Sequence, residues 1–117
     1  MNKIYTLATC TTSQRILKEI APGPEFEFQN IKEENITPEQ LDELYQMTGS
    51  YEALFSKRAL KYKDWGLNKM TLTEADYRRY ILEEYTFLKR PVIVAGKEIF
   101  IGNAPKVVEA AKKVIQS

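Results

Sequence analysis

Histidine is absent from this 117-residue chain, and cysteine occurs only once, at Cys10. Without histidine there can be no Ser–His or Cys–His catalytic pair, and the usual zinc ligand sets are missing. A single cysteine cannot form a disulfide within the chain. We therefore expect no metal site. Any thiol chemistry at Cys10 must be activated by a helix N-terminus or by nearby arginine and lysine side chains.

The chain also has no excess of positive or negative charge. The 17 Lys and Arg residues nearly balance the 16 Asp and Glu residues, which leaves a net charge of +1. That balance gives no indication of a nucleic-acid or membrane surface recognised through bulk charge. No apolar run approaches the length of a membrane span, and the sequence opens on a strand pattern without an apolar signal core. We expect a cytoplasmic protein that binds neither nucleic acid directly nor membranes.

Length and composition suit one globular domain, with 44% hydrophobic and 28% charged residues. Strand patterns are predicted at residues 3–8, 25–31, 91–95 and 98–101. Helices are predicted at residues 13–20, 37–49, about 71–84 and 105–115, with short helical pieces at 51–55 and 58–65. The alternation places Phe26 and Phe28 on the inner side of the second strand, and the last helix should bury Val114.

The order of these elements is β-α-β, a helical insertion, and then β-β-α. A β-α-β unit implies parallel strands with a right-handed crossover, whereas the closing hairpin implies an antiparallel pair. We expect an α/β fold with a thioredoxin-like four-stranded mixed sheet flanked by helices. Residues 1–117 should form a single domain that carries its helical insertion at about residues 37–88.

Cys10 stands where the first strand gives way to the first helix. The unpaired N–H groups and partial positive charge of a helix N-terminus favour a thiolate, and they also favour an oxyanion bound beside it. Thr11, Thr12 and Ser13 follow directly and add hydroxyl groups. A buried structural cysteine is the alternative that this position leaves open.

Two arginines are further candidates. Arg90 precedes Pro91 at the start of a strand; an Xaa–Pro bond there can be cis, and the proline restricts the preceding residue to extended geometry. Arg58 begins a basic segment with Lys61 and Lys63. From the residues alone, a solvent-facing side chain is the simpler interpretation for both arginines.

Three segments together resemble the arsenate reductase (ArsC)/Spx/YffB family. Residues 10–13, Cys-Thr-Thr-Ser, are similar to the Cys-Gly-Thr-Ser active-site loop of the glutaredoxin-dependent arsenate reductases. Residues 54–67 are similar to the stretch that carries the first substrate arginine of the family. Residues 88–94 resemble its Arg-Pro strand, which implies that Pro91 is a structural cis-proline and that Arg90 faces the cysteine. The likeness covers essentially the whole chain, in order and with similar spacing.

The resemblance implies a monothiol oxidoreductase similar to the glutathione- and glutaredoxin-dependent arsenate reductases. Cys10 would be the catalytic thiolate that attacks an oxyanion such as arsenate, or a thiol substrate. Arg58 and Arg90 would bind the oxyanion, a task that suits the planar guanidinium, and Thr12 and Ser13 would assist by hydrogen bonding. No cofactor would be bound, and glutathione or a glutaredoxin would be the reducing partner.

The sequence also departs from the family pattern. Residues 6–9 are Thr-Leu-Ala-Thr where the reductases have a histidine, and residues 101–105 are Ile-Gly-Asn-Ala-Pro where they have a third arginine. The alternative within the resemblance is a non-enzymatic Spx-like regulator that binds RNA polymerase. Ser13 stands where those regulators often have a second cysteine, so an intramolecular redox switch is excluded. Gly49 lies where they present a glycine, although a helix end also explains this residue.

Overall fold

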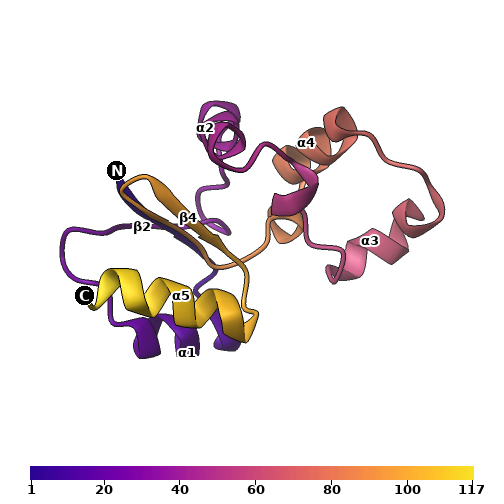
Figure 1. Ribbon diagram of the computed structural model, residues 1–117. Helices are drawn as coiled ribbons and strands as arrows, with labels where there is room; N and C mark the ends of the chain where they lie inside the picture. Colours follow the sequence, from indigo (N-terminus) through magenta and orange to yellow (C-terminus); the bar gives the residue numbers. More distant parts are fainter. The chain divides into compact units, whose positions relative to one another are not determined.

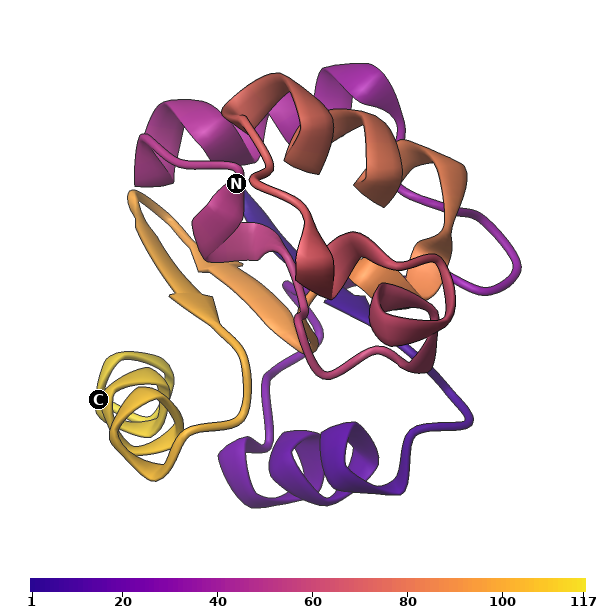
Figure 2. The same ribbon diagram turned by 90° about the vertical axis from the view of Figure 1, so that its right-hand side faces the viewer.

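The computed structural model describes all residues, 1–117, and contains one four-stranded sheet in the order β2-β1-β3-β4 (Figure 1). The strands are β1 (Asn2–Thr6), β2 (Glu27–Asn30), β3 (Val92–Ala95) and β4 (Glu98–Ile101). β1 runs parallel to β2 and antiparallel to β3, and β3 and β4 form the antiparallel hairpin drawn in orange in Figure 2. The predicted mixed sheet is therefore confirmed, and its arrangement is thioredoxin-like.

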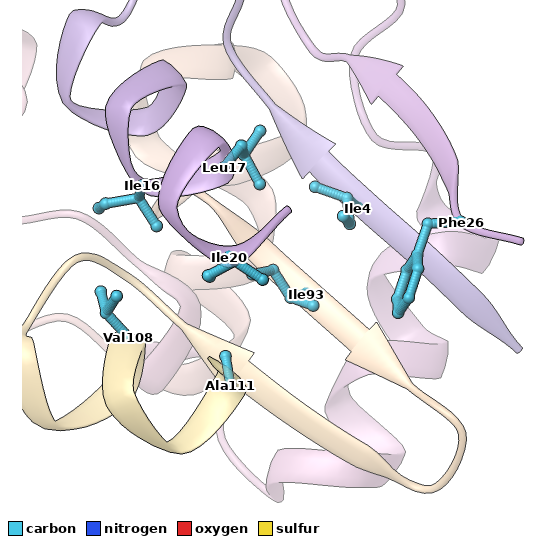
Figure 3. Close-up of a cluster of buried hydrophobic side chains, with 8 residues drawn as sticks. All are labelled: Ile4, Ile16, Leu17, Ile20, Phe26, Ile93, Val108 and Ala111. Carbon is cyan, nitrogen blue, oxygen red and sulfur yellow. The ribbon is translucent and has the colours of Figure 1, made fainter. Parts of the chain in front are cut away.

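Two helices, α1 (Thr11–Ile20) and α5 (Pro105–Ile115), lie on the same face of this sheet (Figure 1). Each has an apolar stripe at helical spacing, so each buries one face against the strands. Figure 3 shows the resulting hydrophobic cluster, which is made by Ile4, Ile16, Leu17, Ile20, Phe26, Ile93, Val108 and Ala111. None of the helices in the protein is long and apolar enough to cross a membrane.

The chain divides into two compact units. The first contains the sheet, α1 and α5, and comprises Met1–Glu34 and Arg90–Ser117. The second, Asn35–Lys89, is helical and covers nearly the residues expected for the insertion. Its elements are α2 (Pro38–Thr48), α3 (Leu60–Asp64), α4 (Glu74–Glu83) and the short 3-10 helices η1 (Glu52–Leu54), η2 (Leu67–Lys69) and η3 (Tyr85–Phe87).

The ends of α2 follow the local sequence. The Thr37 hydroxyl accepts a hydrogen bond from the N–H of Gln40, and the Gln40 side chain accepts one from the N–H of Thr37. This reciprocal pair satisfies two N–H groups that the helix itself leaves unpaired. Gly49 closes the helix at φ 72°, in the left-handed region that glycine adopts without steric cost. The predicted start and end of this helix are confirmed.

The predicted inner face of the second strand is wrong at Phe28. Phe28 is 51% exposed, while its neighbour Gln29 is buried and donates a hydrogen bond from Nε2 to the carbonyl of Glu34. Phe28 lies opposite Ile4 in the β1–β2 register, but β2 is an edge strand and has a neighbour on one side only. Alternation identifies which residues share a face, but not whether an edge position on that face is covered. Phe26, which precedes the strand, is buried as predicted.

Two further expectations need correction. Val114 is 36% exposed and does not belong to the core of α5, because the buried stripe of that helix is carried by Val108 and Ala111. The first strand ends at Thr6 and α1 begins at Thr11, two residues earlier in each case than the pattern suggested. The cause is a turn in which the N–H of Cys10 donates to the carbonyl of Leu7.

Candidate functional site

Cys10 is the residue that directly precedes the first turn of α1. Its backbone is extended, with φ −88° and ψ 107°. Its N–H donates to the carbonyl of Leu7 over 2.9 Å, and its own carbonyl accepts from the N–H of Gln14 over 3.0 Å. The Gln14 side chain also donates to the carbonyl of Leu7, over 3.2 Å. These bonds hold the half-buried cysteine at the N-terminus of the helix, where the helix dipole favours negative charge.

Ser13 lies beside the thiol in the first turn of α1. The residue is fully buried, and its Oγ makes no hydrogen bond to an oxygen or nitrogen atom of the protein. Both the hydroxyl and the backbone N–H of Ser13 act as hydrogen-bond donors toward Cys10. No acidic residue occupies this first turn. A buried donor with no competing acceptor is therefore available to stabilise a thiolate.

Arg90 approaches the same thiol from the start of β3. The Arg90–Pro91 bond is cis, as the sequence predicted. The Arg90 guanidinium donates a hydrogen bond to Cys10 and brings a positive charge close to it. The structure thus brings together Cys10, Ser13 and Arg90, three of the residues that the sequence had singled out, within one compact unit.

The pKa of the Cys10 thiol reflects two opposing effects. Burial disfavours the charged form and raises the pKa. The hydrogen bonds from Ser13, followed by the hydrogen bond and charge of Arg90, lower it and outweigh the burial. The pKa of Cys10 consequently lies below the ordinary value of a cysteine, which increases the thiolate fraction near neutral pH.

The remaining predicted site residues are placed differently. Thr12 lies half-exposed in the first turn of α1, and its hydroxyl has no hydrogen-bond partner within the chain. Arg58 is exposed, forms no ion pair and belongs to the second compact unit, so its role stays a prediction. No group of three histidine, cysteine, aspartate or glutamate side chains is arranged to hold a metal ion.

A groove along the outer face of α1 was not foreseen from the sequence. It has a volume of about 440 Å³ and is lined by Ala8, Thr11, Gln14, Arg15 and Lys18. The four helical residues share the outer face of α1, since they are spaced by three, one and three positions. Their spacing is visible in the sequence, but only the path of the chain through Ala8 turns this face into one wall of a groove.

The fold and the site together define a thioredoxin-like protein with a single-cysteine site supported by a helix N-terminus and an Arg–cis-Pro segment. The family model described as the ArsC family matches residues 5–111. The chain therefore belongs to the ArsC family.

Similar solved structures share this fold at low sequence identity. An arsenate reductase from Vibrio cholerae superposes with a TM-score of 0.76 at 20% identity, covering 97% of this chain and 96% of that chain. A YffB protein superposes with a TM-score of 0.75 at 22% identity, covering 95% of this chain and 98% of that chain. An arsenate reductase (ArsC) related protein from Brucella melitensis superposes with a TM-score of 0.66 at 21% identity, covering 93% of this chain and 92% of that chain. Comparison with curated proteins finds no significant match.

Proposed function

We propose that the protein is a monothiol oxidoreductase in which the Cys10 thiolate attacks an oxyanion such as arsenate, or a sulfur atom of a disulfide substrate. The observation that carries this proposal is the convergence of Ser13 and Arg90 on Cys10, with the lowered thiol pKa that results. Membership of the ArsC family supports a thiol-based oxidoreductase.

The single cysteine determines how the reaction must be completed. Reduction of arsenate to arsenite takes two electrons, and two thiols supply them when they become a disulfide. Cys10 attacks the arsenic atom, water leaves, and a sulfur–arsenic bond forms. Because the chain has no second cysteine, an outside thiol must supply the second sulfur of the disulfide, and arsenite leaves with the electron pair of the sulfur–arsenic bond. We propose glutathione, or a glutaredoxin, as that reducing partner.

The groups around Cys10 are suited to an oxyanion. Arg90 supplies a planar cation, and Thr12 and Ser13 supply hydroxyl groups at the N-terminus of α1. Donors placed where negative charge develops lower the barrier, and loss of one such donor typically reduces the rate by about 10²–10³-fold. In this proposal Arg58 is a second oxyanion ligand, following the family resemblance.

The test is arsenite formation from arsenate with glutathione and glutaredoxin present. Wild-type protein should turn over, whereas Cys10→Ser should reduce the rate to that of the mixture without the protein. Thr71→Ala, in an exposed loop, should retain the wild-type rate. Wild-type turnover that Cys10→Ser leaves intact would contradict the reductase proposal, and so would a wild-type protein that produces no arsenite.

The Spx-like regulator stays an alternative prediction. Gly49 adopts the left-handed conformation at the end of α2, and that role accounts for the glycine without a polymerase partner. Capture of RNA polymerase by both wild type and Cys10→Ser, together with no arsenite formation, would favour the regulator.

A further inference from the structure

Charge is unevenly distributed within the second compact unit. Residues 57–70 contain five basic residues and one acidic residue, a net charge of +4, whereas the rest of the unit contains three basic and eight acidic residues, a net charge of −5. Two of the five cations have acidic partners, while Lys63 and Lys69 are exposed and form no ion pair. The segment that contains α3 is therefore a positive region on an otherwise acidic unit.

The same segment exposes apolar side chains. Leu60 is 83% exposed, Met70 55% and Trp65 44%, and these are three of the six large hydrophobic residues that the protein exposes. Within the unit, α3 packs against η2 and η3 and lies well apart from α2 (Figure 1). Single exposed hydrophobic residues are normal on any surface, but several in one short segment are typical of a site that another molecule covers.

Trp65 is held in place although almost half of it is exposed. Its ring packs edge-on against Phe87, with 5.4 Å between the ring centroids, and is tilted against Tyr80 at 6.1 Å. The ammonium group of Lys61 lies 6.0 Å from the centroid of the Trp65 ring and is itself fixed by the Glu84 carboxylate, over 2.8 Å. A side chain that is already fixed loses little conformational entropy when a partner covers it. Tryptophan is also among the residues that most often dominate the binding energy of interfaces.

We propose that Leu60, Lys63, Trp65, Lys69 and Met70 form a docking surface, the α3 surface, for an acidic segment of a partner protein. This segment carries apolar side chains between its carboxylates. The two unpaired lysines are complementary in charge to the carboxylates, and the exposed apolar residues contact the apolar side chains of the segment. The inference is independent of the proposed thiol chemistry.

Other occupants fit the α3 surface less well. A second copy of the chain would place its own acidic region on this surface, and such a head-to-tail contact continues from copy to copy instead of closing a dimer. Anionic membranes are bound by clusters of about four to eight cations. The α3 surface offers Lys63 and Lys69, with the exposed Asp64 next to Lys63. Charge complementarity together with a rigid aromatic residue favours a protein segment.

The test uses the fluorescence of Trp65, which is the only tryptophan in the protein and lies in the α3 surface. The probe is the peptide Glu-Glu-Leu-Glu-Glu-Leu-Glu-Glu, which contains no aromatic residue. Its titration should move the Trp65 emission to shorter wavelength, because the bound peptide displaces water from the ring. Added salt should weaken the binding, since it screens exposed charges. The same peptide with glutamine in place of glutamate should bind about tenfold more weakly.

Two variants remove separate parts of the α3 surface. Lys63→Gln/Lys69→Gln should weaken peptide binding about three- to tenfold, because both lysines are exposed and unpaired. Leu60→Ser should weaken it about tenfold through lost apolar contact, and the exposed position of Leu60 leaves folding unaffected. The matched control is Lys32→Gln/Lys113→Gln, which removes two positive charges from exposed positions outside the surface and should bind like the wild type.

An unchanged Trp65 emission with the acidic peptide overturns the proposal, and so does equal binding of the glutamine peptide. A control variant that loses as much affinity as Lys63→Gln/Lys69→Gln shows that overall charge attracts the peptide, which also overturns it. A shift in emission with phosphatidylglycerol vesicles or with oligodeoxythymidine, and none with the peptide, would assign the surface to a membrane or a nucleic acid instead. Sedimentation of the protein alone as chains of copies that Lys63→Gln/Lys69→Gln abolishes would assign it to self-association.

Discussion

At Cys10, burial and hydrogen bonding have opposite effects on the pKa of the thiol. Burial favours the neutral thiol, while Ser13 and Arg90 favour the thiolate and prevail. The Ser13 hydroxyl contributes because no other oxygen or nitrogen atom competes for it. Arg90 contributes a hydrogen bond and a charge from a segment that is remote in sequence. The site thus replaces the missing histidine with a helix N-terminus, a buried serine and one arginine.

Arg90→Gln should raise the pKa of Cys10, because it removes the guanidinium charge that stabilises the thiolate. The rate of alkylation by iodoacetamide, measured against pH, should therefore rise at higher pH in the variant than in the wild type. Lys32→Gln, which removes one positive charge from an exposed position, should leave the profile in place. Superimposable profiles for Arg90→Gln and wild type would show that Arg90 does not act on the thiol.

Much of the site could be predicted from the sequence at this scale. The position of Cys10 between a strand and a helix, the adjacent Ser13 and the Arg90–Pro91 pair are local features that sequence patterns reveal. The groove along the outer face of α1 could not be predicted, because Ala8 belongs to a different segment from the helical residues that line the groove. The path of the chain before α1 depends on the fold, and no local pattern contains that information.

Among the elements, α2 and α4 are joined by a polar cluster within the second unit. Arg78 on α4 donates two hydrogen bonds to the Asp42 carboxylate on α2, over 2.9 and 3.1 Å. The Tyr51 hydroxyl donates a third, over 2.6 Å. A carboxylate with these partners is stabilised in its charged form, and the bonds from Arg78 and then Tyr51 lower the pKa of Asp42 to about 2.

This cluster makes a pH-dependent contribution to stability. The pKa of Asp42 is lower in the folded state than its unfolded value of about 3.9. The stabilisation is therefore fully present above pH of about 4 and is lost as the pH falls toward 2. Asp42→Asn should reduce the free energy of unfolding by about 1 kcal/mol at neutral pH, because the pair is partly exposed. The deficit should diminish below pH of about 4.

Denaturant unfolding at pH 7 and at pH 3 measures this effect. Glu43→Gln is the matched control, since Glu43 is the exposed neighbour of Asp42 on the same helix and forms no ion pair. The control should unfold like the wild type at both values of pH. Equal stability of Asp42→Asn and wild type at pH 7 would contradict a stabilising role for the Asp42–Arg78 contact.

Element boundaries show where sequence patterns are sufficient. The capping pair Thr37–Gln40 and the closing Gly49 defined α2 from local chemistry alone. The buried residues of β2 were harder to predict, because Phe28 has the hydrophobicity of a core residue and yet remains exposed. Its exposure follows from the place of β2 at the edge of the sheet. Strand order is a property of the whole sheet, so a single strand sequence cannot provide it.

On the scale of the whole molecule, the sheet pairs strands from two segments that lie far apart in the sequence. β1 and β2 come from the first 34 residues, and β3 and β4 come after the helical insertion. The pairing of Ile4 with Ile93 is one contact of this kind. Cys10 and Arg90 belong to these two separate segments, so the site assembles only when β1 and β3 pair.

The cluster between the sheet, α1 and α5 holds this assembly together. Ile20 is fully buried in it, so Ile20→Ala should lower the free energy of unfolding by about 2–5 kcal/mol through lost burial and a residual cavity. Val114→Ala, at an exposed position of α5, should change it by less than about 1 kcal/mol. Thermal or denaturant unfolding compares the two. Similar losses in both variants would contradict the placement of the core.

The central claim is that Cys10 is a stabilised thiolate in a folded site. Its most direct test is the apparent pKa of Cys10 in the wild-type protein, obtained from the pH dependence of iodoacetamide alkylation. The denatured protein provides the reference for an unperturbed cysteine. We predict a pKa clearly below the free-cysteine value of about 8.5 in the folded protein, returning to that value on denaturation. A folded-state pKa at or above the denatured value, or a thiol that reacts only after unfolding, would contradict the account.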